Sequence, residues 1–96
     1  MPSYLSLVNF TDEGIRDVKD SVQRASGFRS AVEAAGGSVR DIFWAVGEAD
    51  GAAIFDAPDE ETAVSLLLHL THNGFVRTRT MRVFRTEEFE KILAKV

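Results

Sequence analysis

The spacing of apolar residues changes repeatedly along this chain, and these changes constrain its fold more than any other feature. Apolar residues at alternate positions are typical of strands, whereas intervals of three and four are typical of helices. Alternation predicts strands over residues 4–10, 38–46, 52–56 and 75–84. Helical spacing predicts helices over residues 12–35, 58–72 and 87–96. The predicted order is therefore strand, helix, strand, strand, helix, strand and a helical tail.

Capping residues predict where the helices begin and end. Thr11 and Thr86 are expected to cap the first and last helices, because a side-chain oxygen there accepts an otherwise unpaired backbone N–H. Pro58 is expected at the first position of the second helix, where its missing N–H breaks no hydrogen bond. Glycines are typical just beyond a helix end, so Gly36-Gly37 and Asn73-Gly74 are predicted to close the two long helices.

One apolar stripe runs along the first predicted helix and predicts the face that packs on the sheet. The stripe comprises Ile15, Val18, Val22, Ala25, Phe28, Val32 and Ala35. Asp20-Ser21 could cap a new helix, and Gly27 weakens a helix interior by roughly 1 kcal/mol relative to alanine. We therefore expect a kink or break near the middle of this helix, at one of these two places.

Two of the predicted strands carry apolar side chains on both faces. The first strand has Leu5 and Leu7 on one face and Tyr4, Val8 and Phe10 on the other. The second has Ile42, Trp44 and Val46 on one face and Val39, Asp41, Phe43 and Ala45 on the other. The order of elements is typical of a ferredoxin-like α+β fold, βαββαβ, whose antiparallel four-stranded sheet has helices on one face only. We therefore predict a single domain over residues 1–96 that pairs with a second copy through its uncovered apolar face.

Short motifs along nearly the whole chain resemble the GYD-domain family of small bacterial proteins. These are Asn9-Phe10-Thr11, Gly14-Ile15, Gly47-Glu48-Ala49-Asp50, Ala57-Pro58-Asp59 and Val76-Arg77-Thr78. The family's namesake turn reads Gly-x-Tyr-Asp; Gly47 and Asp50 match it, whereas Ala49 replaces the tyrosine. The resemblance implies a ferredoxin-like protomer in a dimeric α/β barrel with a central cavity. We expect no cofactor.

Composition excludes several classes of function. The chain has no cysteine, which excludes disulfides, thiolate nucleophiles and cysteine-bound zinc. A net charge of −4 disfavours a general nucleic-acid binder, because phosphate contacts need surplus lysine and arginine. The longest apolar run is far shorter than the roughly 20 residues that span a bilayer, and no signal peptide pattern precedes it. We expect a cytoplasmic protein with no membrane or nucleic-acid partner.

Two groups of polar residues invite a functional interpretation. His69 and His72 lie three apart in the second predicted helix, but on the face opposite the leucines, so a solvated surface is favoured over a metal site. Four arginines gather in the last predicted strand and just beyond it: Arg77, Arg79, Arg82 and Arg85. A charged edge strand that discourages aggregation is the simpler interpretation, and recognition of an anionic ligand is the alternative.

Candidate site residues surround the predicted inter-sheet cavity. The ligand-binding candidates are Tyr4, Asn9, Phe43, Trp44 and Thr78, and the catalytic candidates are Asp50 and Asn9. Asp50 could instead bond backbone amides within its own turn, as aspartates in turns often do.

Two functions remain open on the sequence. The first is a homodimer that binds a small apolar or aromatic molecule between its sheets. The second is a cofactor-independent enzyme, similar to monooxygenases or isomerases of the same fold, that acts on an activated aromatic substrate. Because one fold serves many functions, the fold cannot decide between them.

Overall fold

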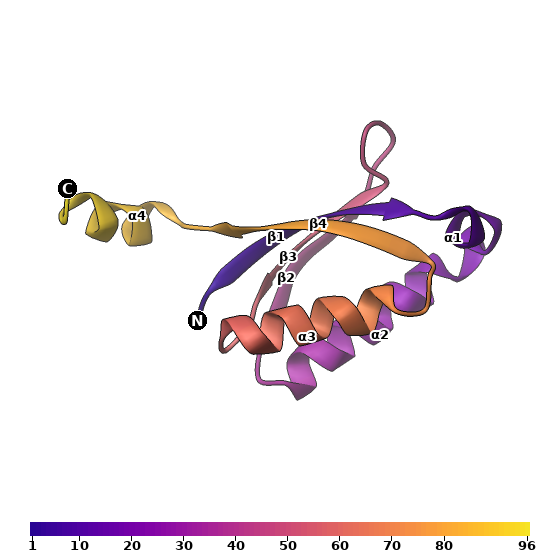
Figure 1. Cartoon of the computed structure of the whole chain (residues 1–96), viewed down its shortest axis with the longest axis horizontal. Helices are drawn as coiled ribbons and strands as arrows, with labels where there is room; N and C mark the ends of the chain where they lie inside the picture. Colours follow the sequence, from indigo (N-terminus) through magenta and orange to yellow (C-terminus); the bar gives the residue numbers. More distant parts are fainter.

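The computed structural model describes residues 1–96 and contains one four-stranded sheet with two long helices on one face (Figure 1). The strands are β1 (Ser3–Phe10), β2 (Ser38–Trp44), β3 (Gly51–Asp56) and β4 (Val76–Val83). The helices are α1 (Asp12–Arg16), the 3₁₀ turn η1 (Val18–Asp20), α2 (Ser21–Ala34), α3 (Glu60–Thr71) and α4 (Thr86–Leu93). The strands lie in the order β2-β3-β1-β4, and every neighbouring pair is antiparallel. The predicted α+β, ferredoxin-like arrangement is confirmed.

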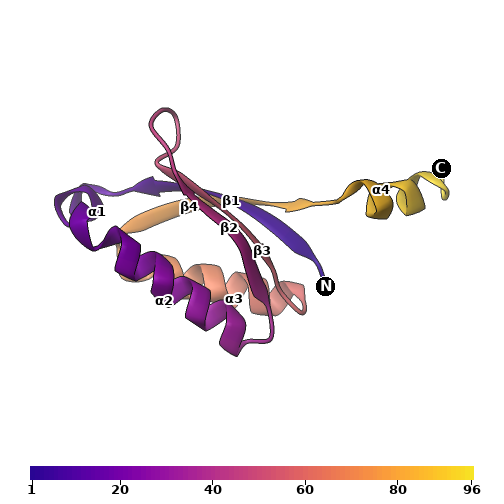
Figure 2. The ribbon, with the colours of Figure 1, turned by 180° about the vertical axis from the view of Figure 1, so that it is seen from behind.

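Both long helices lie on the same face of the sheet, as the view from behind shows (Figure 2), and the core residues belong to these helices and the sheet. Phe55 of β3 is fully buried at its centre, with Tyr4 stacked on it and Phe28 of α2 meeting it edge to face. Both ring pairs have centroids 5.4 Å apart, within the range that favours aromatic pairing. The strand register places Tyr4 and Phe55 side by side, which puts Leu5 and Leu7 on the other face, as predicted.

The first helical region breaks at one of the two predicted places. α1 ends at Arg16, η1 follows, and α2 begins at Ser21, whereas Gly27 lies inside an unbroken helix. The first half of the predicted stripe does not pack in the core: Ile15 and Val22 are exposed, whereas Phe28 and Val32 are buried. The prediction that the whole stripe packs on the sheet was therefore wrong for its first half, which spans α1, η1 and the start of α2.

A bulge in β2 places Val39 on the opposite face of the sheet from the one predicted. Val39 pairs with Phe55 and the next residue to pair, Asp41, meets Ile54, so Arg40 is an extra residue in this strand. The extra residue moves Val39 to the helix-covered face, together with Ile42 and Trp44, because a one-residue shift reverses the side of every side chain.

Two helix starts also differ from the prediction. α3 begins at Glu60 rather than at Pro58, because the Asp59 side chain accepts the Thr62 N–H at 2.8 Å and so acts as the cap. α4 begins at Thr86 itself, with Arg85 at the capping position and its N–H bonded to Glu88 Oε1 at 3.0 Å. The Thr11 cap and both glycine ends are confirmed, since Gly36 and Gly74 adopt positive φ angles of 89° and 84°.

The other face of the sheet has no helix over it. We call this the open face; its apolar side chains are those of Leu5, Leu7, Phe43, Ala52, Ile54, Met81 and Val83. Arg77 and Arg79 of the edge strand β4 lie on the same face. α4 extends beyond the end of the sheet, away from α2 and α3, and buries none of its residues (Figure 1). No helix is long and apolar enough to cross a membrane.

Candidate functional site

A small cavity lies between the first half of α2 and the end of the sheet where β1 and β2 finish. Its volume is about 80 Å³, and 12 of its 17 lining residues are hydrophobic. Its aromatic lining residues are Phe10, Phe28, Phe43, Trp44 and Phe75. Its polar lining residues are Ser6, Ser21, Arg24 and Asp50. An apolar hollow with a few convergent polar groups is the usual form of a small-molecule site.

Trp44 forms one wall of this cavity from the last position of β2. Its indole Nε1–H donates to Ser21 Oγ at 3.2 Å, which ties the end of β2 to the first residue of α2. The residue is still 47% exposed, so the ring lies at the rim rather than in the core. The tryptophan can therefore report on whatever enters the cavity.

Asp50 lies on the cavity wall just before β3. Its Oδ2 accepts the backbone N–H of Phe10 at 2.8 Å, and its own N–H donates to Val8 O at 2.8 Å. Both contacts are with residues of β1. The interpretation in which Asp50 bonds backbone amides within its own turn was therefore wrong. The aspartate fixes the hairpin between β2 and β3 to the end of β1 and presents a carboxylate to the cavity.

Phe75 and Arg24 complete the site from two further elements. The Arg24 guanidinium carbon lies 4.5 Å from the centre of the Phe75 ring, a cation–π contact. The Phe75 carbonyl in turn accepts the Thr11 N–H at 3.1 Å, which holds the start of β4 against the start of α1. Residues of β1, α2, the β2–β3 hairpin, α3 and the start of β4 therefore meet here.

The predicted site residues divide between this cavity and other places. Trp44, Phe43 and Asp50 all line the cavity. Tyr4 lies in the core, and the Asn9 side chain donates to Glu48 O at 3.0 Å. Thr78 is half-buried opposite Val8 in the register and does not line the cavity. Of the predicted candidates, Trp44, Phe43 and Asp50 therefore line the cavity, and Tyr4, Asn9 and Thr78 lie outside it.

Sequence reasoning overlooked Arg24. Its position carried a signal, because Arg24 is three residues after Ser21 and four before Phe28, and these intervals share one helix face. The apolar stripe drew attention to Ala25 and Phe28 instead.

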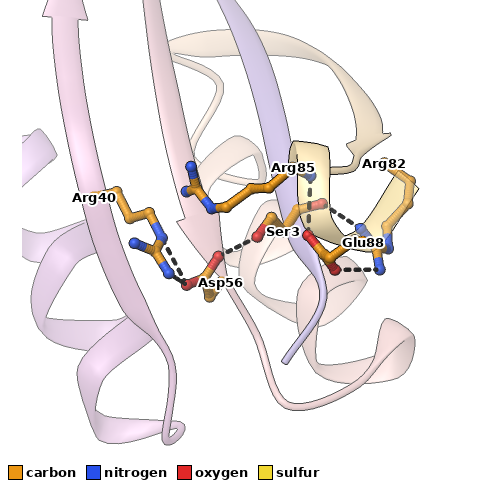
Figure 3. A network of polar contacts seen from close by, with 6 residues as sticks. All are labelled: Ser3, Arg40, Asp56, Arg82, Arg85 and Glu88. Carbon is orange, nitrogen blue, oxygen red and sulfur yellow. Dashed lines mark hydrogen bonds and ion pairs between the residues drawn. The ribbon is translucent and has the colours of Figure 1, made fainter. Parts of the chain in front are cut away.

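A second polar cluster ties β1, β2 and β3 together at the opposite end of the sheet (Figure 3). Ser3 Oγ donates to Asp56 Oδ1 at 2.5 Å, while Arg40 Nε and Nη2 lie 2.9 and 2.8 Å from Oδ2. Both carboxylate oxygens are therefore occupied by partners within the chain. Arg40 is the bulge residue of β2, so this cluster holds the bulge in place.

His69 of α3 and His72, the residue that follows α3, are both exposed, as predicted, with ring centroids 5.5 Å apart. No group of three or more histidine, aspartate or glutamate side chains is arranged to hold a metal ion.

Comparison with protein families adds the identity of the fold family. Residues 4–93 match the GYD domain. The chain belongs to the GYD-domain family. Among solved structures, this GYD domain is similar to TTHA0845 from Thermus thermophilus, with a TM-score of 0.56 and 18% sequence identity. The alignment covers 90% of the GYD domain described here and 96% of TTHA0845, and at this identity it shows a shared fold alone. No curated protein matches the sequence.

Proposed function

We propose that this GYD domain is a homodimeric binding protein for a small apolar or aromatic molecule. The cavity beside Trp44 is the observation that carries the proposal, because its walls are mainly aromatic and aliphatic while Ser21 and Asp50 supply polar contacts. The cavity lies within one protomer, between helix and sheet, and replaces the inter-sheet space as the proposed ligand site.

The size of the cavity limits the ligand. About 80 Å³ is smaller than the roughly 150 Å³ of an engineered protein cavity that binds benzene. We therefore expect it to hold part of a ring or a short aliphatic group, with the remainder of the ligand at the rim formed by Trp44.

Ligand binding is tested by titrating toluene and benzamide while following the fluorescence of Trp44, the single tryptophan. We expect a saturable change, and we expect Ala25→Leu to abolish it because the larger side chain fills the cavity. Ala34→Leu makes the same change at an exposed position of α2 and should bind like the parent protein. Equal binding by the Ala25→Leu variant would place the ligand elsewhere.

The proposed dimer rests on two unpartnered apolar surfaces. The open face carries Leu5, Leu7 and Ile54, and α4 exposes Phe89, Ile92 and Leu93 along one stripe. Their charges are complementary: Glu87 and Glu90 lie on α4, whereas Arg77 and Arg79 lie on the open face without an ion-pair partner. In a dimer whose second copy is turned end to end, the α4 of each copy would lie against Arg77 and Arg79 of the other copy.

Light scattering tests the dimer. The protein should have twice the chain mass of 10.6 kDa, and Leu7→Glu combined with Ile92→Glu should halve it. Val22→Glu also replaces an apolar residue with glutamate, but at an exposed position of α2, and this variant should remain dimeric. A mass of 10.6 kDa for the unmodified protein at micromolar concentration would contradict the proposal.

Cofactor-independent catalysis on an activated aromatic is the second candidate, and the position of Asp50 favours it. A carboxylate on the wall of an apolar cavity is placed to take a proton from a bound phenol. A panel of dihydroxyaromatics, followed by absorbance and oxygen uptake, tests this function. Asp50→Asn should remove the activity while Trp44 fluorescence still reports binding; equal rates in the two proteins would exclude Asp50 as the base.

A further inference from the structure

Arg24 lines the cavity, and its guanidinium has one buried hydrogen-bond donor without a partner. Nη1 donates to Asp17 O at 3.2 Å, and the group stacks on Phe75, but Nη2 is buried without any partner. No carboxylate neutralises it, since the ion pairs of the chain are Arg40–Asp56 and Arg82–Glu88. A charged donor in this position is the exception in folded proteins, where buried polar groups are nearly always paired.

The missing partner is best supplied by a ligand. Leaving a buried charged donor unpaired is costly, and that cost is removed when an anionic oxygen arrives. The rest of the cavity wall is apolar, with the Phe10, Phe75 and Trp44 side chains available to an aromatic ring. The ligand should therefore combine one ring with one anionic oxygen.

We propose that Arg24 binds the carboxylate or phenolate oxygen of a small aromatic monoanion whose ring occupies the cavity. This inference rests on the proposed function and adds the chemical class of the ligand. Asp50 also lines the cavity, so a second anionic group on the ligand would be repelled, whereas a hydroxyl group could donate to the aspartate. The site thus selects a monoanion over a dianion.

A purely structural role for Arg24 makes a different prediction. The contacts with Asp17 O and Phe75 hold the helix break against the start of β4, and losing them would change stability without changing ligand preference. Ligand preference is therefore the quantity to measure.

The test compares benzoate with benzamide, which has nearly the same shape but no charge, by Trp44 fluorescence and by calorimetry. We expect benzoate to bind at least tenfold more tightly, and phthalate, a dianion, to bind less tightly than benzoate. Arg24→Met should remove the preference for benzoate over benzamide, whereas Arg24→Lys should keep part of that preference.

Arg29→Met is the matched control. Arg29 is on the same helix and also donates Nη1 to a backbone oxygen, that of Val39, but it does not line the cavity. The Arg29→Met variant should keep the full preference for benzoate over benzamide. This result would show that the preference depends on a contact with Arg24 and not on the overall loss of one positive charge.

The outcomes distinguish the two proposals. Equal affinity for benzoate and benzamide in the parent protein, or an unchanged preference in Arg24→Met, overturns the role of Arg24 and leaves the binding function intact. Absence of binding by benzoate, benzamide and toluene overturns both. If Arg24→Met does not fold, Arg24→Lys and Arg24→Gln supply the same comparison.

Discussion

The two halves of α2 lie over the same sheet but pack against it differently. In the second half, Phe28 and Val32 are buried in the core with Phe55, and of these two only Phe28 also borders the cavity. In the first half, Ser21, Arg24 and Ala25 lie above Trp44 and Phe75 and leave the cavity open. The closed half supplies the stability of the domain, and the hollow half supplies its candidate site.

Side-chain size and backbone geometry explain this difference. The closed half places a phenylalanine over β3, whereas the hollow half has a serine and an alanine on the corresponding face. The break at η1 also changes the direction of the chain just before Ser21, so α1 does not continue over the cavity. A site is therefore formed where the helix begins, without any interruption in the sheet.

Phe55→Ala tests the closed half and should have the largest effect. The ring is fully buried between Tyr4 and Phe28, and its removal should lower the free energy of unfolding by about 3–5 kcal/mol. Trp44→Ala removes a larger ring in the hollow half, but one that is 47% exposed, and should cost less than half as much. Urea denaturation followed by circular dichroism measures both variants; similar losses would show that the two halves contribute equally.

Gly14→Ala tests how the hollow half is held open. A Cβ at Gly14 would overlap the carbonyl oxygen of Phe75, so α1 must move away from the start of β4. We expect a loss of about 1–3 kcal/mol together with weaker ligand binding, because Phe75 lines the cavity. Thermal denaturation and Trp44 fluorescence give the two quantities.

Gly27→Ala provides the matched control for that substitution. Gly27 lies inside α2 with no atom close to the position of a Cβ, so alanine should stabilise the protein by about 0.5–1 kcal/mol. Destabilisation by this second change would mean that α2 needs flexibility at its centre.

The sequence predicted the order of the elements because that order depends on local periodicity. Alternation located all four strands, and Gly36 and Gly74 ended the long helices as expected. The bulge at Arg40 could not be read in this way, since it depends on how β2 pairs with β3 and on the Asp56 carboxylate that holds it. The predicted face of Val39 was wrong for this reason.

The cavity was less predictable than the fold. Its lining comes from α2, α3 and all four strands or their adjoining turns, and sequence pattern alone does not show which side chains of such distant segments meet. Trp44 and Asp50 were found because each stands out by residue type or turn position. Arg24 and Phe75 were not, because their importance comes from their contact with one another.

The smallest expected effect is at the start of α3, where Asp59 caps the helix. The Thr62 backbone N–H, which bonds the Asp59 carboxylate, holds the pKa of that carboxyl below its ordinary value of 3.8. The ionised form is thus favoured in the folded protein, so its contribution to stability is present above 3.8 and is lost as the pH falls through the lower, folded pKa.

Asp59→Asn keeps a capping oxygen but removes the charge, so its melting temperature should lie slightly below that of the parent protein at neutral pH. The gap should close as the pH falls below 3.8, where the aspartate becomes protonated and resembles the asparagine. Because Asp59 does not line the cavity, ligand affinity at neutral pH should not change. A gap that stays constant into the acid range would show that the carboxylate charge contributes nothing at this cap, and that hydrogen-bond geometry alone fixes the start of α3.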